Sequence, residues 1–156
     1  MKAADSGLIV VVDTREQTPW TFPCDTIRAG LPSGDYSVVG LEHCVALERK
    51  SLADFVGSVT HERDRFWREL GRLQAYAVRA VIVEASIEDI LAGTYVSRAT
   101  PQSVVASLLA IQVDFQIPVL LAGDRGNAQR AGLWMLKRAW AKREEHAGET
   151  GERTEA

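Results

Sequence analysis

Residues 34–50 constrain the fold of this chain more than any other stretch, because their pattern is that of a β-hairpin. A turn at Leu41-Glu42 sets Asp35 directly opposite Glu48. Successive side chains on a strand point to opposite faces, so one face of the hairpin carries both carboxylates. The other face is apolar and suits a core: Tyr36, Val38, Val45 and Leu47.

The acidic face of the hairpin predicts a divalent-metal site. Asp35 and Glu48 would repel each other across the strand pair at a cost in stability, and a bound cation would remove that cost. Carboxylate oxygens are the ligands that Mg²⁺ and Mn²⁺ prefer. Lys50 lies on the same face, whereas Arg49 points away. The simpler alternative is an exposed polar hairpin face on which Lys50 is one of the lysines that protect strand edges.

A second strand precedes the hairpin. Leu8–Val12 is a continuous apolar run, typical of a buried strand, and charge appears abruptly at Asp13. Asp13 either ends this strand at the surface or joins the acidic site. If it joins the site, Asp13 would be a further metal ligand.

Three segments resemble the nuclease domain of the XPF/Hef family of structure-specific DNA endonucleases. They are Val-Asp-Thr-Arg-Glu from residue 12, Gly-Asp-Tyr from residue 34, and Glu-Arg-Lys-Ser-Leu-Ala-Asp from residue 48. The resemblance covers nearly the whole chain except its tail. It implies a restriction-endonuclease-like α/β fold, a three-layer α/β/α sandwich whose central mixed sheet contains the 34–50 hairpin.

The resemblance also implies an activity, that of a Mg²⁺- or Mn²⁺-dependent endodeoxyribonuclease. Hydrolysis would leave a 5′-phosphate and a 3′-hydroxyl, at branched or forked DNA in repair or recombination. Asp35, Glu48 and Lys50 would be catalytic, with Lys50 either orienting or deprotonating water or stabilising the transition state. Two alternatives stay open: a non-catalytic DNA-binding scaffold of the same fold, and a nuclease that acts on unbranched DNA.

Supporting roles fall to residues next to these motifs. We expect Glu16 to hold Arg15 in place, and Asp54 to lie behind the site and orient Lys50. Arg49 is either structural or functional, since it points away from the site although the family motif retains it.

Arginines on a predicted helix are candidates for DNA binding. Arg65, Arg68 and Arg72 occur at helical spacing within residues 62–77 and share one face. Near an acidic site that admits a phosphodiester, we expect them to bind DNA phosphates without reading sequence. Glu69 stands where family members often carry Gln, so no role is transferred to it.

Composition indicates one compact domain, residues 1–142, which the resemblance implies is the nuclease domain, and an acidic, disordered tail, residues 143–156. The tail holds five glutamates against Arg143 and Arg153, which accounts for the whole net charge of −3. Hydrophobic residues make up 46% of the 156-residue chain and charged residues 25%, close to globular averages. Neither a signal peptide nor a membrane span is expected, and Cys24 and Cys44 suit reduced thiols. We therefore expect an intracellular protein, cytoplasmic or nucleoid-associated.

Further elements alternate along the chain. Thr18–Pro23 is extended and broken by prolines, and Ser51 can cap a helix with Leu52, Phe55, Val56 and Val59 on its apolar side. Helices are predicted over 62–77, 86–92, 101–114 and 127–142, and strands over 8–13, 80–84 and 117–121.

The helices at 101–114 and 127–142 carry more apolar surface than one helix face needs, which predicts a homodimer through 101–142. In the alternative, both helices simply cover the sheet. Many relatives also carry a C-terminal tandem helix-hairpin-helix module, which this chain does not show. We therefore expect a fragment or a short form, with DNA grip supplied by a separate partner.

Overall fold

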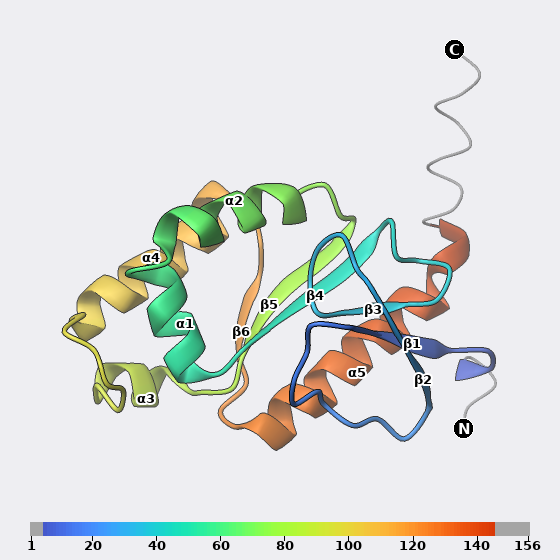
Figure 1. Ribbon diagram of the computed structural model, residues 1–156, viewed down its shortest axis with the longest axis horizontal. Coiled ribbons are helices and arrows are strands. Elements are labelled where there is room, and N and C mark those ends of the chain that lie inside the picture. The colour runs from blue at the N-terminus through green and yellow to red at the C-terminus, as the bar shows by residue number, and fades with distance from the viewer. Residues whose placement is uncertain (1–4, 146–156) are drawn as a thin grey trace, which may run out of the picture.

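In the computed structural model, which describes residues 5–145, a mixed six-stranded sheet lies between layers of helices (Figure 1). Across the sheet the strands are β2 (Asp25–Ala29), β1 (Ile9–Asp13), β3 (Tyr36–Val38), β4 (Val45–Lys50), β5 (Val78–Val83) and β6 (Val119–Leu121). The helices are α1 (Leu52–Val59), α2 (Arg63–Leu73), α3 (Ile87–Leu91), α4 (Pro101–Asp114) and α5 (Arg125–Ala141). The three-layer α/β/α fold with a central mixed sheet is confirmed.

The predicted hairpin register is confirmed. Strands β3 and β4 are antiparallel, with Tyr36 paired to Leu47, so the neighbouring Asp35 and Glu48 fall opposite each other. The hairpin occupies the centre of the sheet, because β3 also pairs with β1 and β4 runs parallel to β5. Its acidic end is therefore held on both sides by backbone hydrogen bonds.

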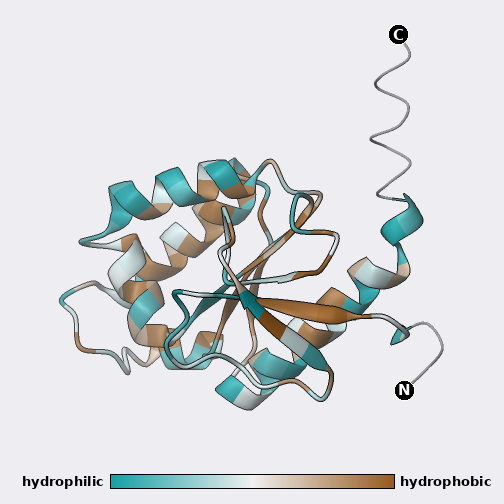
Figure 2. Cartoon of the chain, turned by 45° about the vertical axis from the view of Figure 1, so that its right-hand side comes forward, coloured by the Kyte–Doolittle hydropathy of each residue, from teal (hydrophilic) through white to brown (hydrophobic). Residues whose placement is uncertain are grey.

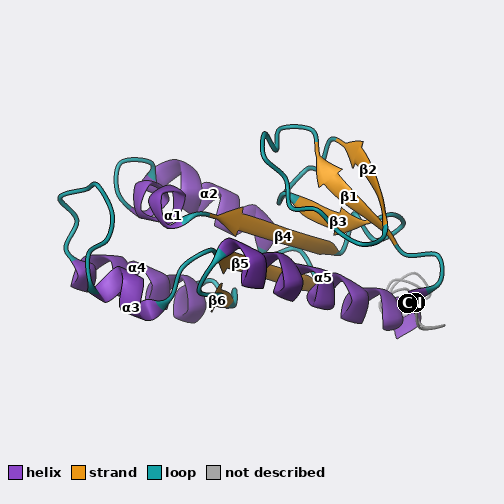
Figure 3. Cartoon of the chain, turned by 90° about the horizontal axis from the view of Figure 1, so that it is seen from below, coloured by secondary structure: helices purple, strands orange, loops and turns teal. Residues whose placement is uncertain are grey.

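Two hydrophobic cores flank the sheet. Helices α1, α2 and α4 pack on one face, around Phe55, Leu70 and Ile111. Helix α5 covers the other face, where the apolar side of the hairpin packs against Trp20 and Leu136. Figure 3 shows β4 between the α1–α2 pair and α5, and Figure 2 shows the apolar colour of the strands and inner helix faces. Of the helices in residues 5–145, none is long and apolar enough to cross a membrane.

Helix starts follow the sequence closely. Ser51 caps α1, and Thr100 caps α4 with Pro101 in the first turn, as predicted. The end of α2 differs: the helix stops at Leu73 rather than at residue 77, and Ala77 is exposed instead of continuing the buried stripe of Phe66 and Leu70.

Strand β2 was not predicted. It pairs in parallel with β1 at the edge of the sheet, and four of its five side chains are exposed. An exposed edge strand lacks the apolar alternation from which strands are recognised. The predicted disorder of the tail concerns residues that lie, from 146 onward, outside the described part.

Two helical glycines give opposite predictions for substitution by alanine. A Cβ at Gly132 in α5 would lie 2.7 Å from the buried Trp20 ring, whereas a Cβ at Gly71 in α2 would meet nothing within 4 Å. We expect Gly132→Ala to destabilise the fold by about 1–3 kcal/mol. Gly71→Ala should stabilise it by about 0.5–1 kcal/mol, because alanine favours helix. Thermal unfolding of both variants tests this contrast, and equal shifts in Tm would contradict it.

Candidate active site

A cavity of about 250 Å³ opens where the acidic end of the hairpin meets β1 and α2. Its lining is mostly polar and comes from four segments of the chain. The charged residues that line it are Asp13, Arg15, Glu16, Asp35, Glu48, Lys50, Arg65, Glu69 and Arg72. The structure thus brings together eight of the eleven predicted site residues, and adds Glu69.

Gly34 allows Asp35 to enter this cavity. It has φ +75°, and a Cβ there would lie 3.0 Å from the Leu47 carbonyl oxygen. Only glycine combines that conformation with so close an approach to β4. The next residue is then fixed by two backbone bonds: Asp35 N donates to Leu47 O at 2.7 Å, and Asp13 N donates to Asp35 O at 2.9 Å.

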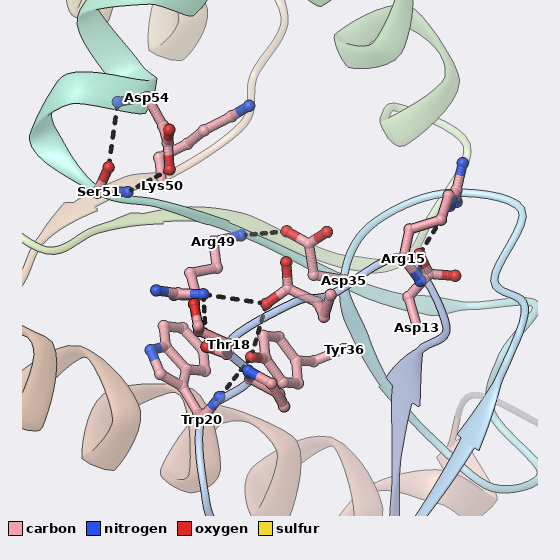
Figure 4. A network of polar contacts seen from close by, with 12 residues as sticks. Asp13, Arg15, Thr18, Trp20, Asp35, Tyr36, Arg49, Lys50, Ser51 and Asp54 are labelled. Atoms are coloured by element: carbon pink, nitrogen blue, oxygen red, sulfur yellow. Dashed lines mark hydrogen bonds and ion pairs between the residues drawn. The ribbon is translucent and has the colours of Figure 1, made fainter.

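The catalytic candidates converge at the mouth of the hairpin. The backbone N–H of Arg49 donates to Asp35 Oδ2 at 2.8 Å, which orients that carboxylate. Lys50 Nζ lies 3.6 Å from Glu48 Oε1 and 4.9 Å from the centre of the Phe66 ring. Figure 4 shows Lys50 and Arg49 leaving β4 in opposite directions, as the alternation of the strand predicted.

The two carboxyl groups hold protons unusually well. Burial raises the pKa of Asp35 to about 7, against the opposing hydrogen bond from Arg49 N. Burial, and after it the charge of Asp35, raises the pKa of Glu48 to about 8. Two neighbouring carboxyl groups repel each other when both are ionised. A bound cation offsets that repulsion, so the site favours a cation.

The stability of the metal-free protein should therefore fall as pH rises. Asp35 and Glu48 bind protons more tightly folded than unfolded, so their contribution is complete below about pH 4 and is lost as pH rises through about 7 to 8. Thermal unfolding in chelator from pH 5 to pH 9 measures this slope. Glu48→Gln should flatten it, and Mg²⁺ should raise Tm more at pH 8 than at pH 6. Parallel slopes for the variant and the wild type would contradict the assignment.

Asp13 reaches the cavity with its carboxylate already bonded. Oδ2 accepts from Arg15 Nε at 2.8 Å, and Oδ1 accepts from Leu31 N at 2.8 Å. Burial opposes ionisation, but these bonds outweigh it and leave the pKa of Asp13 below its usual value. Asp13 is thus ionised beside the site, and its role as a metal ligand stays a prediction.

The expectation that Glu16 holds Arg15 is wrong. Glu16 Oε2 accepts from the Tyr36 hydroxyl at 2.9 Å and from Arg49 Nη1 at 3.2 Å, while Asp13 and Leu31 O hold Arg15. Glu16 therefore joins β3 to β4 through the Tyr36 hydroxyl and the Arg49 guanidinium.

Arg49 is the centre of a buried network on the α5 side of the sheet (Figure 4). Its guanidinium bonds Glu84 at 3.0 Å, Glu16, and the Thr18 carbonyl oxygen at 3.0 Å. The Trp20 ring centre lies 6.0 Å from Arg49 Cζ. Trp20 also stacks on the Tyr36 ring, and its Nε1 donates to Glu84 at 3.3 Å. The network fixes the strand whose backbone orients Asp35.

Sequence reasoning missed Glu84 and Trp20 as members of this network. One signal was available for Glu84: it follows a buried apolar strand, as Asp13 does. The loop contacts of Trp20 had no such signal, because its partners lie 16 and 64 residues away.

Asp54 lies elsewhere than expected. It forms a reciprocal capping box with Ser51, accepting from Ser51 N at 3.4 Å and donating its own N–H to Ser51 Oγ at 3.1 Å. Its hydrogen bonds within the described chain go to Ser51 and not to Lys50. Asp54 therefore supports the site by starting α1 directly after β4.

The three arginines of α2 differ in their surroundings. Arg65 pairs with Glu62 at 2.7 Å and with Glu69 at 3.8 Å. Arg72 lines the cavity, whereas Arg68 does not, and neither has an ion pair within residues 5–145. Arg72 is thus the best placed to meet a phosphate.

The donor set fits a magnesium-type ion bound by two carboxylates. Within residues 5–145, no three Asp, Glu, His or Cys side chains cluster as a complete metal cage would. Mg²⁺ is usually held by one or two carboxylates, with water and substrate phosphate completing its shell. Asp35 and Glu48, facing one cavity, meet that requirement.

Comparisons with known proteins show what this chain is similar to. A family model described as the ERCC4 domain matches residues 12–129. A structure of XPF from Aeropyrum pernix is 25% identical with a TM-score of 0.61, over 86% of this chain and 60% of that one. A complex of Aeropyrum pernix XPF with DNA gives 25% identity and a TM-score of 0.63, over 90% and 66%. The chain thus spans less than two thirds of these solved chains, and no curated protein matches it.

Proposed function

This chain belongs to the ERCC4 domain family, the family of the XPF nuclease, and from that premise we propose that it is a Mg²⁺- or Mn²⁺-dependent endonuclease of branched or forked DNA. The observation that carries the proposal is the pair of half-buried carboxyl groups, Asp35 and Glu48, that face one cavity together with Lys50. We expect the protein to act on DNA in the cytoplasm or nucleoid, during repair or recombination.

The residues divide the work of phosphodiester hydrolysis. Asp35 and Glu48 would hold a divalent cation, with Asp13 as a further candidate ligand. When bound, the cation would supply Lewis acidity at the scissile phosphate and would make a nearby water more acidic. Lys50 lies 3.6 Å from Glu48 and is placed to orient or deprotonate the water, or to stabilise the charge that develops on the phosphate. Arg72, and Arg65 once released from its acidic partners, bind flanking phosphates.

Cleavage of labelled forked, flapped and linear DNA, with Mg²⁺ and with Mn²⁺, tests this function. We expect metal-dependent cutting with a preference for the branched substrates. Equal rates on linear DNA would move the assignment to a nuclease of unbranched DNA. DNA binding without cutting by the wild type would favour a scaffold, or an enzyme that requires a partner for DNA grip.

We also propose that the protein is a homodimer through residues 101–142. Some apolar side chains of these helices are buried within the protein: Val104, Leu108, Leu133 and Leu136. Other apolar side chains of this region stay exposed: Leu109 (50%), Val113 (67%), Leu120 and Trp134 (65%). Surplus apolar surface of this kind is typical of an interface.

Trp134→Ser should shift the protein toward monomer in light scattering coupled to gel filtration, because it removes the largest of these exposed side chains. Leu91→Ser is the matched control, since Leu91 is 58% exposed but lies on α3. A monomeric wild type at all concentrations would leave the alternative, in which the helices only cover the sheet.

A further inference from the structure

A second cavity, of about 470 Å³, lies at the start of α2. It is formed by the end of α1 and the residues that lead into α2, the first turns of α4 and the loop before α4. Arg63, Arg98 and His61 line it, and no acidic side chain of the described chain does. Hydroxyl groups supply the rest of its polar surface: Thr60, Ser97, Ser103 and Ser107. Its chemistry is therefore the reverse of the acidic cavity and suits an anion.

Arg63 is held rigidly in this cavity. Its Nη1 donates to the Val59 carbonyl oxygen at 3.1 Å and to the buried Ser107 Oγ at 2.8 Å. The guanidinium also stacks on Trp67 at 3.8 Å. The hydrogen bonds recorded within residues 5–145 use only Nη1, so the N–H groups of Nε and Nη2 are left for a ligand. A planar guanidinium edge of that kind matches two oxygens of a phosphate.

Arg98 contributes a second positive charge. It is exposed and makes neither a hydrogen bond nor an ion pair with the described residues. This contrasts with Arg65 on the other flank of α2, which Glu62 and Glu69 neutralise. The cavity thus combines the Arg63 guanidinium, which its hydrogen bonds hold in place, with the Arg98 guanidinium, which has no partner within residues 5–145.

We propose that this cavity binds a backbone phosphate of the DNA substrate, at a distance from the phosphate that is cut. The proposal rests on the proposed nuclease function. Phe66, against which Lys50 lies, is three residues from Arg63 on α2. Helix rise and width put the two cavities on the order of 10 Å apart, or about three base pairs of B-DNA. One duplex arm can therefore reach both.

The test measures DNA affinity, in a protein that cannot cut. Arg98→Ala is compared with Arg138→Ala, both in the Asp35→Asn background. Arg138 is the matched control, because it is an exposed arginine of α5 with no ion pair in the described chain. Fluorescence anisotropy is recorded over a range of salt, with a long duplex arm and with an arm that ends about one base pair beyond the cut.

We expect Arg98→Ala to weaken binding of the long arm about three- to tenfold, and to lower the salt slope by about 1. Arg98→Lys should restore most of the affinity, and the short arm should not respond. Equal affinities of Arg98→Ala and Arg138→Ala on the long arm would overturn the proposal. If the protein bound no DNA at all, the nuclease function itself would fail, which is a different result.

Discussion

Asp35→Asn should lower the rate of DNA cleavage by about a thousandfold or more. The substitution keeps the shape of the side chain but removes one of two carboxylates that face the cavity. Losing a metal ligand removes several kcal/mol of transition-state stabilisation, and each 1.36 kcal/mol is tenfold in rate. The amide oxygen can still accept from Arg49 N, so the hairpin should keep its geometry.

Single-turnover cleavage of labelled forked DNA measures this loss. Lys50→Ala should cost about 10²–10⁴ in rate, because it removes a group for proton transfer or charge stabilisation. Metal titration followed by Tm separates the two variants. Asp35→Asn should weaken the stabilisation by Mg²⁺, whereas Lys50→Ala should retain it. Asp35→Asn that cuts within tenfold of the wild-type rate would refute the assigned metal site.

Arg49→Ala should destabilise the fold by about 3 kcal/mol, or roughly 10 °C in Tm. Arg49 is only 13% exposed, and its partner Glu84 only 6%. Removal of the guanidinium leaves Glu84 buried with Trp20 Nε1 at 3.3 Å and Arg125 at 3.7 Å, and breaks the link to Glu16. Breaking one side of a buried pair is costly because the remaining charge loses its partner.

Arg125→Ala is the control for this prediction. Arg125 contacts the same Glu84 carboxylate but is 45% exposed, so its removal should cost less than about 1 kcal/mol. Arg49→Lys should fall between the two, since lysine keeps the charge without the planar fork. Urea unfolding at fixed pH gives the free energies, and equal losses for Arg49→Ala and Arg125→Ala would contradict the role of the buried network.

Much of the fold and site could be predicted because it follows from local rules. The alternation of side chains with period two set Asp35 opposite Glu48, sent Arg49 to the other face, and put Tyr36 and Leu47 in the core. Start signals at Ser51 and Thr100 located α1 and α4. Edge strand β2 escaped prediction, because exposed side chains leave no periodic signal.

Which distant side chains meet depends on tertiary packing. The sequence alone specifies the hairpin, its register and the carboxylates it brings together, since strand and helix periods act over a few residues. It did not determine that Glu16 binds Arg49, 33 residues away, or that Glu84 closes the same network. Such contacts depend on how sheet and helices pack. For that reason neither the place of Glu69 beside Asp35 and Glu48 nor the basic cavity at the start of α2 could be predicted from the sequence.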